Sequence, residues 1–264
     1  YTLSLHDALP ILVIAVVFGL IYGRKAKSMA EATGKDVSVI KQIMEAFFKK
    51  FSAASNWLKK NTKFGRRNLY VENPMGRRRR LWPYLLDENN DGYEYKAAEI
   101  DRVSCNSPIQ GLGSDLGFLG ARLLVSRVEQ YRKKHNLSKP PLRLQNMIHD
   151  ATISEVDYDY LLQATKVIDD SLTAGNQKQV ERLFGMKFPV DIEVEFEIGP
   201  CEAYMFKWDK SEKNLQEIFY KSLLWQKHHG HDVKPLTVLK SVFDKPLIDT
   251  KAIRAEFEKQ FGNA

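Results

Sequence analysis

A histidine and an aspartate, His149 and Asp150, are the side chains whose position first suggests chemistry. They lie between two short apolar-rich segments, 143–148 and 151–156, which predict two strands joined by a tight hairpin. Such a tip is exposed, so a metal ion or a substrate can approach it. Mg²⁺ prefers the hard oxygens of carboxylates, which makes Asp150 a candidate metal ligand. The alternative is an aspartate that only caps the turn.

A block of positive charge dominates the first third of the chain. Between Arg24 and Arg80 there are 16 Lys or Arg and only four Asp or Glu, a net charge of +12. The whole chain of 264 residues carries +7, so the remainder is at −5. Such a block is typical of proteins that bind a polyanion, most simply nucleic acid. The alternative is a solvated basic face without a partner.

Two further sets of side chains repeat every four residues, the spacing that places them on one face of a helix. Arg102, Asn106 and Gln110 form the first set and combine a cation with two amides. Phe18 and Tyr22 form the second set. Periodicity alone would assign these two rings to a hydrophobic core.

The composition indicates which class of protein must position these residues. With 44% hydrophobic and 28% charged residues, 15 Gly and 10 Pro, it excludes a collagenous, a wholly disordered and a disulfide-scaffold protein. The two cysteines, Cys105 and Cys201, have no CxxC spacing. They predict a reducing compartment and neither a disulfide framework nor a zinc cluster. We expect a folded, mildly basic, cytoplasmic protein.

The uncharged segment 8–23 differs from the rest of the chain. It is shorter than the ~20 apolar residues that a membrane span needs, and Pro10 interrupts it. No Lys or Arg precedes it, as one would in a secretory signal. We therefore expect a buried helix and no membrane association, with a membrane anchor as the alternative. Residues 1–11 resemble translated sequencing adapter, which indicates a leader that is not native.

Helices and a hairpin are predicted for the basic block. Gly34 ends one helix, Asp36 begins the next, and apolar residues then recur at helical spacing as far as Leu58. The turn-forming quartet 73–76 predicts a hairpin, and Arg77–Arg80 follow its tip.

The second half of the chain predicts one long helix and one clear strand. Ser114 and Asp115 predict the start of an amphipathic helix that ends near Asn136. Strict alternation of apolar and acidic residues predicts a strand over 190–198 with one buried face. The remaining helices are predicted over 159–172, 176–185 and, in a mixed-charge appendage, 211–264.

In their order along the chain, these segments resemble the C-terminal half of a family A (polymerase I type) DNA polymerase. Phe18–Gly23 matches the FGxxYG end of that family's fingers helix, and Met75–Pro83 is similar to its GRRRxLP segment. Arg102–Asp115 looks like the RxxxNxPxQGxxxD element, and Met147–Asp150 resembles the VHD hairpin. Gly199–Trp208 resembles the closing strand. Several motifs in the correct order and spacing are far more specific than any one of them.

The resemblance implies an α+β fold. It has a helical fingers region and part of an antiparallel-sheet palm, which together are an incomplete right-hand polymerase fold. The fingers helices would occupy 12–65, and the palm part, with its DNA-facing helices and metal hairpin, 66–210. A helical C-terminal appendage would follow at 211–264, and the leader would occupy 1–11.

The resemblance also implies roles for single residues in template-directed DNA synthesis, the transfer of a dNTP to a primer 3′-hydroxyl in DNA replication. Two Mg²⁺ ions catalyse this reaction, and Asp150 would be a ligand to them. Tyr22 would be a second catalytic residue, and His149 would lie near the primer terminus of the bound DNA. The other implied contacts are Phe18 and Tyr22 with the incoming nucleotide, Arg77 and Arg78 with DNA phosphates, and Arg102, Asn106 and Gln110 with the minor groove.

Three departures from the family pattern concern the catalytic machinery. The family has an Arg and a Lys facing the triphosphate where this chain has Pro10 and Ile14. The family's first catalytic aspartate lies upstream of the fingers helix and has no counterpart here. Ala151 stands where many members have Glu. We therefore expect an N-terminally truncated piece of a polymerase that is inactive alone. Ala151 and the C-terminal tail favour a phage-like replicative enzyme over a bacterial repair enzyme.

Two other functions fit parts of the pattern. A single-subunit RNA polymerase shares a His-Asp hairpin and a fingers Tyr-Gly, although Gly76–Pro83 and Asn106–Gly111 favour the DNA enzyme. The choice of dNTP over rNTP rests on the resemblance. A non-catalytic, basic DNA-binding protein would bind DNA equally well without Asp150. We expect the histidines of 228–231 to form an exposed helix end rather than a transition-metal site. The residues identify no processivity factor.

Overall fold

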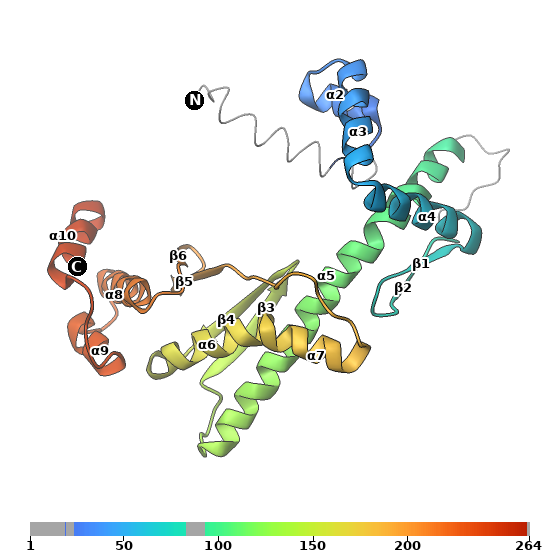
Figure 1. Ribbon diagram of the computed structural model, residues 1–264. Helices are drawn as coiled ribbons and strands as arrows, with labels where there is room; N and C mark the ends of the chain where they lie inside the picture. Colours follow the sequence, from blue (N-terminus) through green and yellow to red (C-terminus); the bar gives the residue numbers. More distant parts are fainter. Residues whose placement is uncertain (1–18, 20–23, 83–92, 263–264) are drawn as a thin grey trace. The chain divides into compact units, whose positions relative to one another are not determined.

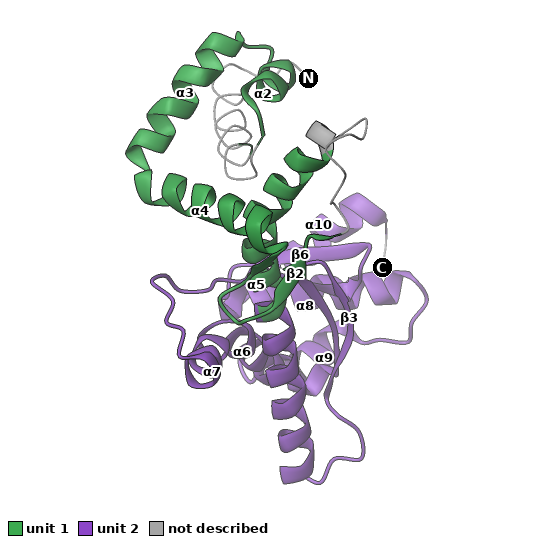
Figure 2. Ribbon diagram, turned by 90° about the vertical axis from the view of Figure 1, so that its right-hand side faces the viewer, with its two compact units in different colours: residues 1–115 green, residues 116–264 purple. Residues whose placement is uncertain are grey.

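The computed structural model describes Gly19, residues 24–82 and residues 93–262. The chain divides into two compact units, residues 1–115 and residues 116–264 (Figure 2). Phe18 and Tyr22 lie outside the described residues, as does most of the expected helix over 8–23. The expected functional boundaries after residues 11, 65 and 210 stay predictions.

Three helices follow one another in the first unit (Figure 1). They are α2 (Ala26–Thr33), α3 (Val37–Lys50) and α4 (Ser52–Asn68). Gly34 ends α2 at a φ of 66°, and Asp36 precedes α3, as predicted, although the Asp36 side chain makes no capping hydrogen bond.

The expectation of one helix as far as Leu58 is wrong, because the helix stops at Phe51. The backbone there takes φ −108° and ψ 54°, and the Phe51 ring lies 4.8 Å from that of Phe47, measured between centroids. A one-residue interruption leaves the spacing of apolar residues almost unchanged, so hydrophobic periodicity could not reveal it.

A two-stranded antiparallel hairpin follows α4. Its strands are β1 (Tyr70–Glu72) and β2 (Arg78–Arg80), with Tyr70 opposite Arg80 and Glu72 opposite Arg78. The predicted hairpin and its turn are therefore confirmed. An isolated hairpin is marginally stable in water, so this one depends on packing. A small buried cluster anchors it to the following helix and consists of Val71, Leu81, Ile100 and Val103.

The helix α5 runs over 42 residues, from Tyr93 to Lys134, and contributes to both units. The expected helix start at Ser114 is wrong, because the helix is already formed there. The Ser114 hydroxyl donates to the carbonyl of Gln110 over 3.1 Å, the bond that a serine inside a helix makes. The residue types that favour a helix start also occur inside helices when their side chains bond elsewhere.

The second unit contains the predicted His-Asp hairpin. Its strands are β3 (Leu142–Ile148) and β4 (Ala151–Val156), which pair antiparallel around a two-residue tip. Helices α6 (Leu161–Leu172) and α7 (Ala174–Phe184) follow a short 3₁₀ turn, Tyr158–Tyr160, and confirm two further predicted helices. The base of the hairpin is packed against α5 and α6 by a buried cluster of Leu124, Val128, Leu142 and Ala164.

The strand expected over 190–198 is only partly formed. Residues 190–195 are not in a strand, and β5 begins at Phe196 and ends at Cys201, paired with β6 (Tyr204–Trp208). The acidic residues of the segment are exposed and its apolar residues, apart from Val190 at 71% exposure, are at least half-buried, as the alternation predicts. Alternation reports which residues face the core, whereas strand pairing also needs a neighbouring strand.

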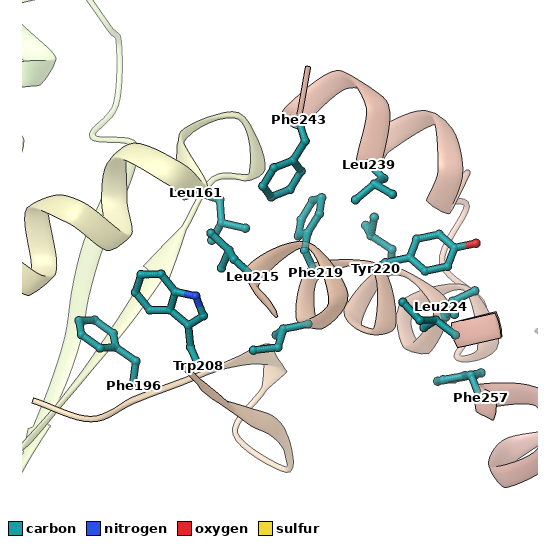
Figure 3. Packing of buried hydrophobic residues seen from close by; sticks show 13 residues of the cluster. Leu161, Phe196, Trp208, Leu215, Phe219, Tyr220, Leu224, Leu239, Phe243 and Phe257 are labelled. Atoms are coloured by element: carbon teal, nitrogen blue, oxygen red, sulfur yellow. The ribbon is translucent and has the colours of Figure 1, made fainter. Parts of the chain in front are cut away.

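Three helices follow β6, namely α8 (Glu212–His228), α9 (Pro235–Val242) and α10 (Thr250–Phe261), so the helical structure predicted for 211–264 is observed. Figure 3 shows the cluster that unites them with β5 and β6. Leu215, Phe219 and Leu223 of α8 are at most 5% exposed and contribute to the same core as Trp208. The appendage therefore completes the core of the second unit.

The fold class is confirmed: the described residues form mostly helices and three two-stranded antiparallel sheets. Among these residues, no helix has the length and apolar character that crossing a membrane requires.

Candidate functional site

The arginine hairpin, residues 70–80 of the first unit, carries its four arginines on β2 and directly before it. Arg78 is exposed, and its Nε donates to Glu72 Oε2 over 2.6 Å across the strand pair. Its guanidinium lies 4.8 Å from the centroid of the Tyr70 ring. The hydrogen bond to Glu72 raises the pKa of Arg78. An exposed pair of this kind is weak, and Arg78 can exchange Glu72 for a phosphate oxygen.

Arg77 occupies a different environment, against α5. Its Nε lies 3.2 Å from Asp115 Oδ1, and its Nη2 donates to the carbonyl of Gly111 over 2.9 Å. Gly111 follows Gln110 in the chain, so the tip of the arginine hairpin lies beside the predicted DNA-facing edge of α5.

That edge is formed by Arg102, Asn106 and Gln110, which the structure places at helical spacing on α5 as predicted. Arg102 and Gln110 are exposed, and Arg102 forms hydrogen bonds with Glu99 that lower the pKa of that carboxyl. Asn106 is only 8% exposed, and its Oδ1 accepts no hydrogen bond from the described residues.

Five of the six predicted DNA contacts, Arg77, Arg78, Arg102, Asn106 and Gln110, therefore lie in one compact unit, and the sixth, His149, lies in the other. Two residues of this site, Asn73 and Asp115, were not identified as functional candidates from the sequence. The sequence pattern indicates only a turn former at Asn73 and a helix start at Asp115. Their presence inside motifs that also carry Arg77 and Gln110 was the signal that could have identified them.

His149 and Asp150 form the tip of the β3–β4 hairpin in the second unit, and both are exposed. The strand β3 spans about 20 Å from the buried Leu142 to the tip. A register irregularity between Leu144 and Asn146 bends β3 on the way, and such bulges often lie next to functional sites. The hairpin is thus anchored at its base and free at its end.

His149 adopts a left-handed backbone conformation, with φ of 56°. This conformation costs an L-residue about 1–2 kcal/mol, a cost that glycine does not have. A two-residue hairpin turn commonly needs a positive φ at its tip, and Leu69, Asn136 and Lys210 also have a positive φ, so the conformation of His149 follows from the turn.

Replacing His149 with glycine is expected to stabilise the hairpin by about 1 kcal/mol, because glycine adopts a positive φ without steric cost. Amide hydrogen exchange in residues 142–156 should slow by about fivefold. The matched control is Asp150→Gly, since Asp150 does not have a positive φ; this change should speed exchange. Slower exchange in the control but not in His149→Gly would contradict the assignment of strain.

The carboxylate of Asp150 makes no hydrogen bond or ion pair with the residues that the structure describes, so its interpretation as a turn-capping aspartate finds no support. A complete magnesium site needs several oxygen ligands. No group of three His, Cys, Asp or Glu among the described residues is placed to hold a metal ion. Asp150 therefore fits as one ligand, and these residues do not form the whole site.

The other candidate side chains have structural roles. Cys105 is buried, which raises the pKa of its thiol, and it contacts Thr62. His228 is the last residue of α8, and the His229 ring stacks on Trp225 at 3.8 Å, so the exposed helix end is confirmed.

A model of DNA polymerase family A matches residues 13–203. DNA polymerase I of Chloroflexus aurantiacus is 28% identical over 195 residues, which cover 74% of this chain and 18% of the relative. DNA polymerase theta of Drosophila melanogaster is 28% identical, with 70% of this chain and 8% of the relative covered. Thermostable DNA polymerase I of Thermus aquaticus is 26% identical, and the match covers 67% of this chain and 19% of the relative.

Among solved structures, the chain is similar to the POL domain of Pol1 from M. smegmatis in complex with DNA primer-template and dNTP. The TM-score is 0.51 at 25% identity, and the match covers 62% of this chain and 27% of that chain. The chain spans less than a fifth of the length of the three polymerases named in the preceding paragraph. These relatives are bacterial and animal proteins and give no support to a phage-like origin.

Proposed function

Because the chain belongs to DNA polymerase family A, we propose that it forms part of the primer-template binding surface of a DNA-directed DNA polymerase and supplies one of its metal ligands. The reaction would be the transfer of a nucleotide from a dNTP to a primer 3′-hydroxyl during DNA replication. The observation that carries the proposal is the contact of Arg77, at the tip of the arginine hairpin, with Gly111 and Asp115 of α5. This contact places the arginine hairpin beside the edge of α5 that carries the Arg102 cation and the amides of Asn106 and Gln110.

In this proposal the hairpin and the helix edge contact different parts of DNA. Guanidinium groups such as those of Arg77 and Arg78 neutralise phosphates, a contact that fixes position without reading sequence. Arg102, Asn106 and Gln110 donate to the acceptors that every base pair presents in the minor groove. A DNA polymerase needs this combination, because it must hold any sequence and still sense correct pairing. The DNA polymerases among the relatives favour this function over an RNA polymerase.

The β3–β4 hairpin would serve the chemical step. Family A polymerases use Mg²⁺, and when bound, the two ions activate the primer hydroxyl and stabilise the charge on the triphosphate. Asp150 would hold such an ion from the exposed tip, and His149 would contact the primer terminus. Phe18 and Tyr22, which lie outside the described residues, would pack against the incoming nucleotide, and Tyr22 would act as a catalytic residue.

The test is primer extension by the 264-residue chain, with DNA binding measured in the same samples. We expect the chain to bind primer-template and to extend it at no measurable rate, because Pro10 and Ile14 cannot neutralise a triphosphate and Asp150 alone cannot hold two metal ions. Processive, magnesium-dependent synthesis would refute the inactivity of the chain alone. Absence of DNA binding would refute the proposed surface.

A further inference from the structure

The tip of the arginine hairpin is organised by one buried amide. Asn73 is 5% exposed, and its Oδ1 accepts hydrogen bonds from the backbone N–H groups of Met75 at 3.0 Å and of Arg77 at 2.9 Å. The backbone N–H of Asn73 also donates to the carbonyl of Arg77 over 3.0 Å. The acceptor side of this amide is therefore used entirely within the turn, which leaves its Nδ2 to reach outward.

Asp115 of α5 receives that outward donor. Asn73 Nδ2 donates to Asp115 Oδ2 over 2.5 Å, and the other oxygen, Oδ1, lies 3.2 Å from Arg77 Nε. The Asp115 side chain is 19% exposed, which makes it far better shielded than Arg77 at 53%. One carboxylate thus joins the turn amide and the first arginine of the hairpin to the helix.

Gly111 leaves the space that this junction needs. A Cβ added there would lie 3.3 Å from Arg77 Nη2 and 3.5 Å from Asn73 Nδ2. The carbonyl of the same residue accepts from Arg77. The helix backbone and the hairpin tip therefore approach each other at the position where no side chain intervenes.

We propose that Asp115 is a positioning residue, which fastens the arginine hairpin to α5 through Asn73 and Arg77. The cations of the hairpin are thereby aligned with the edge of α5 that contains Gln110, so that both can bind DNA. This inference rests on the proposed function. A carboxylate beside a phosphate-binding surface repels DNA by its charge alone. Removing the charge should therefore tighten DNA binding if Asp115 acts only electrostatically, and weaken it if Asp115 acts by positioning.

The first experiment compares Asp115→Asn with Asp101→Asn in the 264-residue chain, by fluorescence anisotropy with a primer-template duplex. Both changes remove one negative charge from α5, but Asp101 pairs with Arg66 and does not touch the hairpin tip. Charge-assisted hydrogen bonds are strong enough that we expect Asp115→Asn to weaken binding by about tenfold. Asp101→Asn should bind as well as the wild-type chain or better.

A second variant exchanges the two partners, Asn73→Asp with Asp115→Asn. The exchange keeps the net charge of the wild-type chain and restores a donor opposite an acceptor. We expect it to recover most of the lost affinity, whereas Asn73→Asp alone places two carboxylates together and should bind less tightly than Asp115→Asn. Failure of the exchange to recover affinity would count against the geometric role.

Amide hydrogen exchange in residues 70–80 tests the fastening without DNA. Asp115→Asn should speed exchange in this segment by about tenfold, and Asp101→Asn should leave it unchanged. Equal or tighter DNA binding by Asp115→Asn, or unchanged exchange in the hairpin, would overturn the proposal. If the wild-type chain binds no DNA, the proposed function fails, and the exchange data still decide whether Asp115 fastens the hairpin.

Discussion

Replacing Asp150 with asparagine in a complete polymerase that contains these residues is expected to reduce turnover by about 10³-fold or more. An amide has no negative charge and is a poor ligand for Mg²⁺, so the transition state of the metal-assisted step loses several kcal/mol of stabilisation. Each factor of ten in rate corresponds to about 1.4 kcal/mol. The Asp150 side chain has no partner among the described residues, so its loss should leave the fold intact. Steady-state kinetics of primer extension would measure the effect.

The matched control is Glu155→Gln on the same hairpin. Glu155 pairs with Arg143 at 3.1 Å and accepts a hydrogen bond from Gln145, both on the neighbouring strand and away from the tip. An exposed pair of this kind is worth little, so turnover should change by less than about threefold. Primer-template affinity should be unchanged in both variants. Retained activity in Asp150→Asn would show that Asp150 is not a metal ligand.

Removing the Arg78 guanidinium is expected to reduce the salt dependence of DNA binding by the 264-residue chain. Each phosphate contact contributes about −0.9 to the slope of log K against log salt concentration, because one bound counterion is released. Arg78→Ala should therefore reduce the magnitude of the slope by about 0.9 and weaken binding several-fold at low salt. Anisotropy titrations at a series of salt concentrations give both quantities.

Lys251→Ala is the control for this variant, since Lys251 is an exposed cation on α10, outside the arginine hairpin. It changes the net charge of the chain by the same amount. Its slope should equal that of the wild-type chain. An equal change of slope in the two variants would mean that only the total charge matters, and it would refute a specific contact by Arg78.

Sequence reasoning predicted local structure well wherever turn chemistry and periodicity agreed. Two short apolar-rich segments flank the tip at His149 and Asp150, and the observed strands have almost the predicted bounds. The quartet that begins at Asn73 likewise predicted the arginine hairpin. In both cases the information is local, because a turn is determined by a few neighbouring residues.

The features that the sequence did not reveal depend on contacts between distant residues. Asp115 contacts Asn73, which lies 42 residues earlier, and no local pattern reports such a pair. The alternation before Phe196 predicted exposure correctly except at Val190, but it could not supply a strand partner. The end of α3 at Phe51 shows the same limitation, since a change in helix direction leaves the apolar spacing intact.

Primer-template binding by the 264-residue chain, measured at salt concentrations from about 50 to 200 mM, tests the central claim most directly. Phosphate contacts by the arginine hairpin predict measurable binding at the lowest salt. They also predict a log–log slope of about −2 to −4, from roughly two to four neutralised phosphates. Absence of binding at the lowest salt, or an affinity that does not change with salt, would contradict the account.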